Sequence, residues 1–336
     1  MNNHRDLIMK KVLLPLLLLY LCPTIYGQVI RGVVMDEQTK APIDYASVYF
    51  DGTFVGCTTD EEGRFELDVT EYKSRSLTIS AVGYHSGVLS EFTPGKTHQL
   101  CLTPRVFEIK EVSVSTRSLA RKRRACMRIF VNEFIGLSSN ARKCHILNEE
   151  DITFNYGFDK DTLQAYAFKP IRILNLALGY EITYHLDRFE YDRHTKTVLY
   201  TGNIIFNNDL AFDKESQTKF DRRRTYAYTG SCKHFFRSLW NNTLKPSGFI
   251  VSSYRTGEPL LFENIVYQDI EGRKFLRYKE ALKIDYYEIL TYISFIEART
   301  LFEEDGFFDP TSIIWTGEMS RQRIADFLPY EYLLPR

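Results

Sequence analysis

The chain has 336 residues, and its 43 lysines and arginines balance its 43 aspartates and glutamates, so the formal net charge at pH 7 is zero. A balanced charge argues against general nucleic-acid binding, which requires a basic surface. The length suits two domains better than one. After the N-terminal region, no apolar stretch approaches the roughly 20 residues that a membrane-spanning helix needs.

Residues 1–27 have the pattern of a secretory signal peptide. Arg5, Lys10 and Lys11 precede the apolar run VLLPLLLLYL, which is too short to span a bilayer. We expect cleavage after Gly27. The alternative is lipoprotein processing at Cys22, but the preceding LYL lacks the small residue that such processing needs. Removal of the signal leaves 40 basic against 42 acidic residues and predicts an exported protein without a transmembrane helix.

Five cysteines remain after the signal: Cys57, Cys101, Cys126, Cys144 and Cys232. No CxxC pair occurs, so neither a zinc ribbon nor a thioredoxin-like site is encoded. An oxidising compartment permits disulfides, but an odd number leaves at least one thiol unpaired within the chain. The sequence leaves the pairing open.

The region 28–115 alternates short β-rich runs with turn residues, as in a β-sandwich. Asp51-Gly52 between ASVYF and TFVGCTT predicts a hairpin with a two-residue turn. In RFELDV, Phe65, Leu67 and Val69 point one way and the charged residues the other, which predicts a half-buried antiparallel strand. The closing KEVSVS is read as a further strand.

The tract TTDEEG before RFELDV has two readings, a calcium loop or a turn. A calcium EF-hand needs its acids at alternating positions, whereas Asp60, Glu61 and Glu62 are adjacent and a strand follows at once. Asp60 can bond its own backbone two residues on, and Gly63 can supply a positive φ. We therefore interpret the tract as the turn of a β-hairpin and predict no metal site.

These residues together resemble the carboxypeptidase-regulatory-like domain, which also stands at the front of many TonB-dependent outer-membrane receptors of Gram-negative bacteria. The resemblance implies a seven-stranded, transthyretin-like (prealbumin-like) β-sandwich over residues 28–115. It also implies a location in the periplasm or at the outer-membrane surface. The matching positions are Gly32, Val34, Asp36, Thr39, Pro42, Ile43, Ala46, Val48, Gly52, Gly56, Thr59, Asp60, Gly63, Phe65, Leu67, Gly83 and Tyr84.

The sequence does not carry the zinc-binding pattern of carboxypeptidases. None of the seven histidines has a glutamate three residues on, and no His-Glu-x-x-His occurs. We accordingly predict no catalytic, cofactor-binding or metal-binding residues.

Residues 116–336 are expected to form a larger α+β domain with an antiparallel sheet. Met127, Phe130, Val131 and Phe134 recur at helical spacing after a basic start. YEITYHLDRFEY alternates until Asp187-Arg188 and then slips by one residue, which predicts a β-bulge. Ile324, Phe327 and Leu328 suggest a short final helix stopped by Pro329. The whole region is similar to the C-terminal part of uncharacterised envelope proteins with the same first module.

The tract from Arg222 to Asn242 predicts a helix with Ser231 as its N-cap and an apolar face that includes Cys232. His234 falls on the opposite side, so it cannot pair with Cys232 as a base. The basic side has two readings, a solvated face or a patch for phosphate, sulfate or carboxylate groups. The patch would comprise Arg222, Arg223, Arg224, Lys233, His234 and Arg237.

Three functions are compatible with these features. The leading hypothesis is a non-enzymatic envelope protein whose sandwich docks an envelope protein or glycan partner, peripheral to the outer membrane and with a role in membrane assembly or nutrient uptake. The second is a secreted hydrolase whose carboxylates converge from distant parts of residues 116–336. The third is a receptor-related or small outer-membrane barrel protein, against which the clustered charges of Glu190, Asp192 and Arg193 argue.

Overall fold

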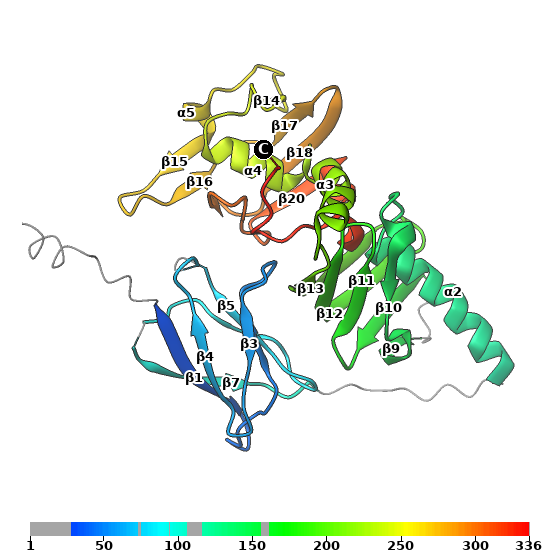
Figure 1. Cartoon of the computed structure of the whole chain (residues 1–336). Helices are drawn as coiled ribbons and strands as arrows, with labels where there is room; N and C mark the ends of the chain where they lie inside the picture. The colour runs from blue at the N-terminus through cyan, green and yellow to red at the C-terminus, as the bar shows by residue number, and fades with distance from the viewer. Residues whose placement is uncertain (1–27, 73–74, 94, 106–115, 156–160, 336) are drawn as a thin grey trace, which may run out of the picture.

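The computed structural model describes residues 28–72, 75–93, 95–105, 116–155 and 161–335. The predicted signal peptide therefore lies outside the described residues. The buried apolar side chains form three clusters, each enclosed largely by β-strands, and Figure 1 shows the three corresponding bodies. The prediction of a mainly β protein with some α-helix is confirmed. No helix in the described ranges has the length and apolar character needed to cross a membrane.

Residues 28–105 form the sandwich, whose core includes Ile30, Val34 and Val48. The predicted seven strands are present in two sheets, ordered β4-β1-β7 and β3-β2-β5-β6. The pairing of β1 with β7 is parallel, which the sequence pattern did not indicate. The strand read at KEVSVS lies outside the described residues. The bounds are β1 (Val29–Asp36), β2 (Ser47–Tyr49), β3 (Gly56–Thr58), β4 (Arg64–Asp68), β5 (Leu77–Ser80), β6 (Gly87–Leu89) and β7 (Thr97–Leu102).

The predicted turn at Asp60 is confirmed. Its Oδ1 accepts hydrogen bonds from the backbone N–H groups of Glu62 at 3.0 Å and Arg64 at 2.7 Å, and Gly63 has φ of 71°. The hairpin interpretation is wrong, however, because β3 pairs with β2 and β4 pairs with β1. The turn thus carries the chain from one sheet of the sandwich to the other.

The predicted hairpin around Asp51-Gly52 is present as the antiparallel pair β2 and β3. Its connection is not a two-residue turn, because the paired residues Tyr49 and Gly56 enclose a loop of residues 50–55. The side chain of Asp51 and the backbone of Gly52 instead make contacts outside the sandwich. This loop is called the β2–β3 loop below, and it joins the sandwich to the middle body.

The middle body, residues 116–228, packs α2 (Thr116–Phe134) and α3 (Lys214–Tyr228) with a six-stranded sheet. The predicted helical face on α2 is confirmed, because Met127, Phe130 and Phe134 are buried. The rings of Phe130 and Phe134 stack with centroids 4.9 Å apart. Short 3-10 turns η1 (Ala141–Lys143) and η2 (Glu149–Asp151) precede strands. The strands are β8 (Cys144–Ile146), β9 (Ile152–Asn155), β10 (Thr162–Ala167), β11 (Ile171–Asn175), β12 (Tyr180–Asp192) and β13 (Val198–Asp209).

Strand β12 organises this sheet, with β10 and β11 on one side and β13 on the other. The predicted bulge is confirmed by a register shift between Leu186 and Arg188. Gly202 on β13 lies opposite the bulge, and a Cβ there would come within 2.2 Å of the backbone oxygen of His185. Close approach of the two strands therefore requires glycine at this position.

The C-terminal body, residues 232–321, surrounds the apolar face of α4 (Cys232–Trp240) with a four-stranded and a three-stranded sheet. Residues 116–336 thus contain two separate cores where the sequence suggested one larger domain. The remaining bounds are β14 (Phe249–Ser253), α5 (Phe262–Ile265), β15 (Val266–Gln268), β16 (Lys274–Leu276), β17 (Leu282–Tyr286), β18 (Ile289–Phe295), β19 (Thr300–Phe302), β20 (Ile313–Gly317) and η3 (Met319–Arg321).

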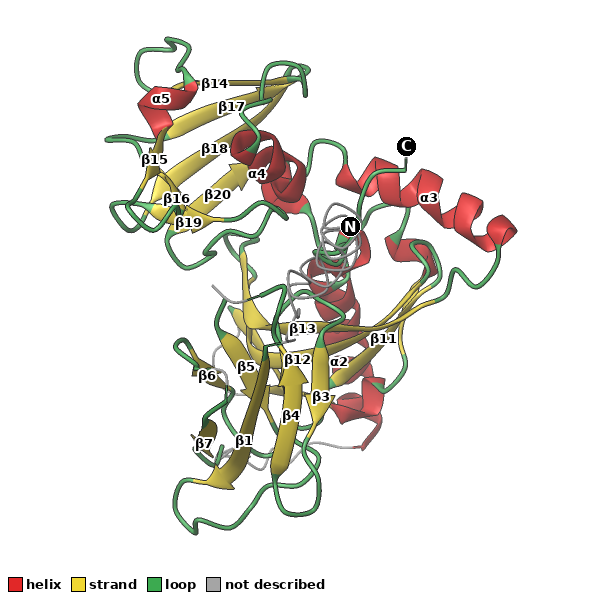
Figure 2. Ribbon diagram, turned by 60° about the vertical axis from the view of Figure 1, so that its left-hand side comes forward, coloured by secondary structure: helices red, strands yellow, loops and turns green. Residues whose placement is uncertain are grey.

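Residues 322–335, called the C-terminal segment below, return from this body to the middle one. Ile324, Ala325, Leu328 and Tyr332 belong to the core of the middle body. The predicted short final helix is a single 3-10 turn, η4 (Ile324–Asp326), placed before Pro329 as expected. Figure 2 shows the end of the chain near α3.

Candidate functional site at the junction of the three cores

The β2–β3 loop of the sandwich lies along β13 of the middle body. The N–H of Gly52 donates to the Ile204 carbonyl at 2.8 Å, and the N–H of Phe206 donates to the Thr53 carbonyl at 3.0 Å. The ring of Phe54 packs against the rings of Tyr180 and Phe206, with centroids 6.0 and 5.8 Å away. The loop therefore covers the edge of the middle sheet as a short added strand, so an exposed edge is closed.

Asp51 adds a buried carboxyl group to this contact. Its Oδ1 accepts a hydrogen bond of 2.6 Å from the N–H of Ile204. Burial raises the pKa of Asp51 to about 6, because the charged form loses its hydration inside the interface. The contact between the sandwich and the middle body thus includes a group that titrates near pH 6.

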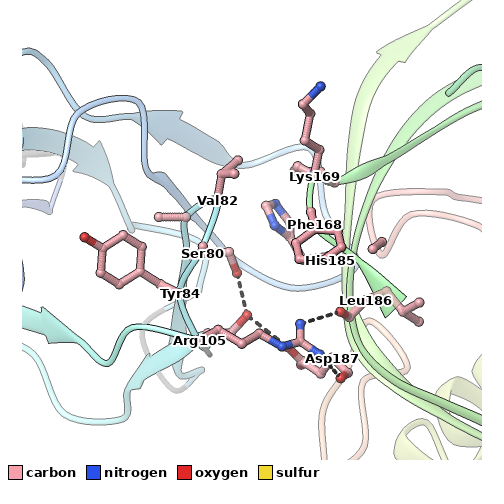
Figure 3. Close-up of a pocket in the computed structure, with 14 residues that line it drawn as sticks. Ser80, Val82, Tyr84, Arg105, Phe168, Lys169, His185, Leu186 and Asp187 are labelled. Atoms are coloured by element: carbon pink, nitrogen blue, oxygen red, sulfur yellow. Dashed lines mark hydrogen bonds between the residues drawn. The ribbon is translucent and has the colours of Figure 1, made fainter. Parts of the chain in front are cut away.

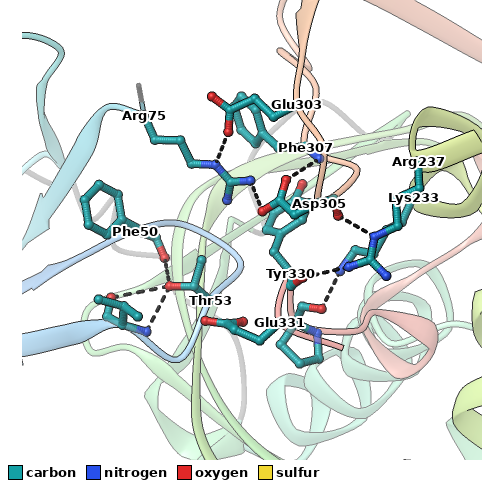
Figure 4. A network of polar contacts seen from close by, with 12 residues as sticks. Phe50, Thr53, Arg75, Lys233, Arg237, Glu303, Asp305, Phe307, Tyr330 and Glu331 are labelled. Carbon is teal, nitrogen blue, oxygen red and sulfur yellow. Dashed lines mark hydrogen bonds and ion pairs between the residues drawn. The ribbon is translucent and has the colours of Figure 1, made fainter. Parts of the chain in front are cut away.

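Arg75 joins the sandwich to the C-terminal body. Its side chain is buried, and its guanidinium forms ion pairs with Glu303 at 2.8 Å and with Asp305. The guanidinium carbon also lies 4.4 Å from the ring centroids of Phe307 and Tyr330. Figure 4 shows this cluster, called the Arg75 network below. A planar guanidinium can bind carboxylates at its edge and stack on aromatic rings with its faces, which an ammonium cannot do.

Two cations of α4 hold the C-terminal segment in place. The ammonium of Lys233 donates to the carbonyls of Leu328 at 2.5 Å and Pro329 at 2.6 Å. Arg237 donates to the carbonyls of Tyr330 at 2.8 Å and Tyr332 at 2.6 Å. Burial, followed by the neighbouring charge of Arg237, lowers the pKa of Lys233 well below its usual value. Lys233 and Arg237 on the basic side of α4 therefore hold the C-terminal segment through internal hydrogen bonds.

The six residues of the predicted anion patch are not gathered on one exposed face. Arg224 is buried and binds Asp209 through two hydrogen bonds of 2.9 and 2.6 Å. Arg223 donates to Asn140 at 3.3 Å, and Arg222 is exposed. The assumption that the whole basic side faces solvent is wrong, because α4 lies between the C-terminal body and the returning segment. Helical periodicity gives the direction of a side chain but not the presence of a second packing surface.

The local prediction for α4 is confirmed at its start, where Ser231 is the N-cap and its hydroxyl accepts from the N–H of His234 at 3.0 Å. His234 packs between the rings of Tyr228 and Phe249, each with a centroid distance of 4.9 Å. Its Nδ1 accepts from the N–H of Gly230 at 3.1 Å, and burial lowers its pKa to about 4. Burial raises the pKa of the Cys232 thiol to about 12. A protonated thiol and an imidazole engaged elsewhere do not make a nucleophile–base pair.

A small polar pocket of about 30 Å³ lies between the sandwich and β12. Ser86 connects Ser80 to Asp187, with hydrogen bonds of 2.8 Å between the serine hydroxyls and 3.4 Å from Ser86 to Asp187. Figure 3 shows the pocket, with Ser80 and Asp187 labelled. Arg105 closes one side by donating to the Leu186 and Asp187 carbonyls. This volume is close to that of one water molecule. The pocket therefore serves as part of the interface and is too small for an organic substrate.

His185 borders the same pocket but does not activate either serine. Its ring stacks on Tyr49 with centroids 5.6 Å apart, and its Nε2 is buried and makes no hydrogen bond to any residue in the described ranges. The hydroxyl of Ser80 is bonded to Tyr49 at 3.0 Å and to Ser86. Burial lowers the pKa of His185 to about 4, so the imidazole is neutral at physiological pH.

A larger hollow of about 390 Å³ lies between α3, the C-terminal segment and the β2–β3 loop. Phe54 comes from the loop, Tyr180 and Asp221 from the middle body, and Glu331 and Tyr332 from the segment. Sequence reasoning did not identify these residues or Arg75. Each is an isolated aromatic or charged position, and no spacing signal connects residues that meet only through tertiary packing.

Within the residues that the structure describes, Cys57, Cys101, Cys126, Cys144 and Cys232 form no disulfide with one another. Cys101 is exposed, and Cys126 and Cys144 are buried. Burial raises the pKa of Cys57 to about 11 and that of Cys144 to about 12. These thiols are therefore packing groups rather than reactive ones, with Cys101 as the accessible exception.

Comparison with known proteins extends these observations. No curated protein matched the sequence. Among solved structures, a 9R-lipoxygenase from Cyanothece is 12% identical and has a TM-score of 0.16, too low to support any argument. That alignment covers 66% of this chain and 48% of the lipoxygenase, about half its length. Residues 30–114 match the family model of the CarboxypepD_reg-like domain, as the sequence resemblance implied, and this region is a CarboxypepD_reg-like β-sandwich.

Proposed function

We propose that this chain is a non-enzymatic, exported protein of a Gram-negative envelope, whose sandwich docks an envelope protein or glycan partner. The observation that carries the proposal is the Arg75 network, in which a charged side chain of the family-matched sandwich is buried against the C-terminal body. Such burial fixes the sandwich to the other two bodies. A partner held by the sandwich is therefore held in a defined orientation to the rest of the chain, as a scaffold requires.

The docking surface would lie on the parts of the sandwich that the other bodies leave open. Tyr45 and Val88 are 71% and 63% exposed. Large apolar side chains at the surface favour partner contacts, although single ones are common on any protein. Val88 belongs to β6, which is the last strand in the order of its sheet, and edge strands are the ones that can pair with an added strand.

The absence of enzymatic activity is part of the proposal, and the pocket beside His185 supports it. The serines there are hydrogen-bonded to Tyr49, to each other and to Asp187, while the His185 Nε2 bonds to neither serine. Nucleophilic catalysis needs a hydroxyl paired with a base and a space for the substrate. This pocket provides neither.

A direct test uses the full chain, because deleting the sandwich would uncover the rings of Tyr180 and Phe206 that Phe54 covers. A photo-crosslinking amino acid is placed at Tyr45 or Val88, and for comparison at Ile250 or Ile314 of the C-terminal body, which are 56% and 52% exposed. We expect one discrete envelope partner to crosslink from the sandwich positions. Crosslinks confined to the C-terminal body would contradict the docking role.

Export and lack of activity are tested separately. N-terminal sequencing of the protein from fractionated cells should give a chain that begins at Gln28 in the envelope fraction. Recovery of the uncleaved chain from the cytoplasm would refute export. Turnover of peptide, ester or glycoside substrates by the purified chain, retained through all purification steps, would refute the non-enzymatic role.

A further inference from the structure

Helix α2 has a charge imbalance that neither the docking role nor the packing of the core explains. From Thr116 to Asn132 it contains no acidic residue, and its basic residues are Arg117, Arg121, Lys122, Arg123, Arg124 and Arg128. Cations near the start of a helix oppose its macrodipole, and like charges three or four residues apart repel each other. The sequence thus breaks two rules of helix stability in one place, which is typical of a functional surface.

Three of these arginines share one exposed face. Arg121, Arg124 and Arg128 are spaced at i, i+3 and i+7, and all three side chains are exposed. They are called the arginine stripe below. Met127 falls on the other side of the helix and is buried in the core of the middle body, while Lys122 is also exposed. Figure 1 shows the N-terminal half of α2 reaching past the edge of the sheet.

The arginine stripe forms no ion pair with any residue in the described ranges. Of the acids in the neighbouring turn η2, Asp151 pairs with Lys169 at 3.2 Å. Arg123 differs from the stripe, because it donates to the carbonyls of Ile152 at 2.7 Å and Glu149 at 2.6 Å. Helix α2 therefore uses one arginine for packing and presents a separate row of arginines to its surroundings.

The shape of this surface fits an extended array of anions better than one small anion. The stripe lies on the convex side of a helix and lines neither the pocket beside His185 nor the hollow beside α3. Guanidinium forks match phosphate groups, and several such contacts add up on a surface that carries many phosphates. The exposed positions Ala120 and Ala125 provide no amide or aromatic side chain, which proteins use to read or stack nucleic-acid bases.

We propose that the arginine stripe of α2, together with Lys122, binds the phosphate headgroups of an anionic lipid surface. Because the apolar side of α2 is buried in the middle body, the helix can rest on such a surface but cannot insert into it, so the attachment is electrostatic and reversible. The choice of lipid as the anionic partner rests on the proposed export to the envelope. The surface itself goes beyond the docking role, because it belongs to the middle body and needs no protein partner.

Sedimentation of the full chain with vesicles tests the proposal. Vesicles of equal parts phosphatidylglycerol and phosphatidylcholine present anionic phosphates. Vesicles of phosphatidylcholine alone control for apolar insertion, including insertion by the apolar run in residues 1–27. We expect the anionic vesicles to bind at least about tenfold more tightly than the neutral ones, with an affinity that falls as salt rises. Equal binding to both kinds of vesicle, or binding that salt does not weaken, would overturn the proposal.

A triple variant locates the binding. Arg121→Gln, Arg124→Gln and Arg128→Gln together neutralise the stripe, and glutamine preserves helix propensity. Each basic residue near an anionic membrane strengthens binding about fivefold, so the variant should bind the anionic vesicles on the order of 100-fold more weakly. Thermal unfolding should show that the variant remains folded, because the replaced side chains are exposed. Wild-type affinity in this folded variant would refute the assignment.

The control variant loses the same charge from α3, where glutamine replaces three exposed cations, Lys214, Lys219 and Arg222. It should keep the wild-type affinity, and equal losses in the two triple variants would reveal a net-charge effect and refute the assignment. Inorganic phosphate and duplex DNA are added as competitors at the phosphate concentration of the vesicles. Full displacement of the chain by either one would make the stripe a free-anion or nucleic-acid site and reject the lipid surface. The crosslinking test of the docking role uses no vesicles, so the two proposals can fail separately.

Discussion

Replacement of Arg75 by alanine tests the idea that buried charge fixes the sandwich to the C-terminal body. The substitution removes the guanidinium that pairs with Glu303 and Asp305 and stacks on Phe307 and Tyr330. The two carboxylates then lose the charged group that binds both of them. Loss of this attraction, together with the partial burial of the carboxylates, acts against the docked arrangement.

The expected loss follows from the burial of each group. Removing one partner of a fully buried pair costs about 3–5 kcal/mol, because the other charge remains in a poorly solvated place. Here the side chains of Glu303 and Asp305 are 19% and 27% exposed, so water can solvate part of each carboxylate. We therefore expect a loss of about 2–3 kcal/mol in the free energy of unfolding.

Urea unfolding monitored by tyrosine and tryptophan fluorescence measures this loss. With a slope of about 2–3 kcal/mol per molar urea, the midpoint should fall by about 1 M. Arg31→Ala is the matched control, because Arg31 makes a similar paired contact with Glu66 but both side chains are more than half exposed. Surface pairs contribute little, so this control should leave the midpoint nearly unchanged. Equal shifts in the two variants would refute the reasoning.

Three further predictions concern the core, the interface and the thiols. Gly202→Ala should lower stability by about 3 kcal/mol in thermal or urea unfolding, since the new Cβ meets backbone atoms, whereas Gly257→Ala, with open space around it, should cost about 1 kcal/mol. Asp51→Asn should raise the free energy of unfolding at pH 7 by up to about 3 kcal/mol and change it little at pH 4. The reason is that the folded state raises the pKa of this carboxyl to about 6, so ionisation of Asp51 destabilises the folded state increasingly as the pH rises from about 4 to 6. A stabilisation of the same size at pH 4 would contradict this cause. One thiol per folded chain should react quickly with Ellman's reagent, and Cys101→Ser should abolish that phase.

Local features of the fold could be predicted from the sequence because short-range chemistry determines them. The Asp60 turn depends on one side chain and one glycine, the Ser231 cap on one hydroxyl, and the β12 bulge on a phase slip in an alternating strand. The resemblance to the family also allowed the seven strands of the sandwich to be predicted. Each of these involves residues close in sequence or a pattern carried by the whole module.

The predictions that failed concerned contacts between parts of the chain that are far apart in sequence. The turn after β3 was taken for a hairpin because sequence spacing does not show to which sheet a strand belongs. Lys233 and Arg237 were assigned to an outward face because helical periodicity gives no sign of a chain segment returning about 95 residues later. The larger hollow beside α3 could not be predicted for the same reason, since wall residues such as Asp221 and Glu331 are far apart in sequence.

The position of the C-terminal segment has a consequence for synthesis. Ile324, Ala325 and Leu328 complete an apolar core whose other members begin at Cys126. During translation, that core remains incomplete until the C-terminal segment has emerged, and Lys233 and Arg237 can form their hydrogen bonds to its carbonyls only then. The sandwich can form early, but the middle body depends on contacts of long sequence separation, which form slowly. A premature stop before Ile324 would thus leave an open apolar surface for chaperones and proteases to recognise.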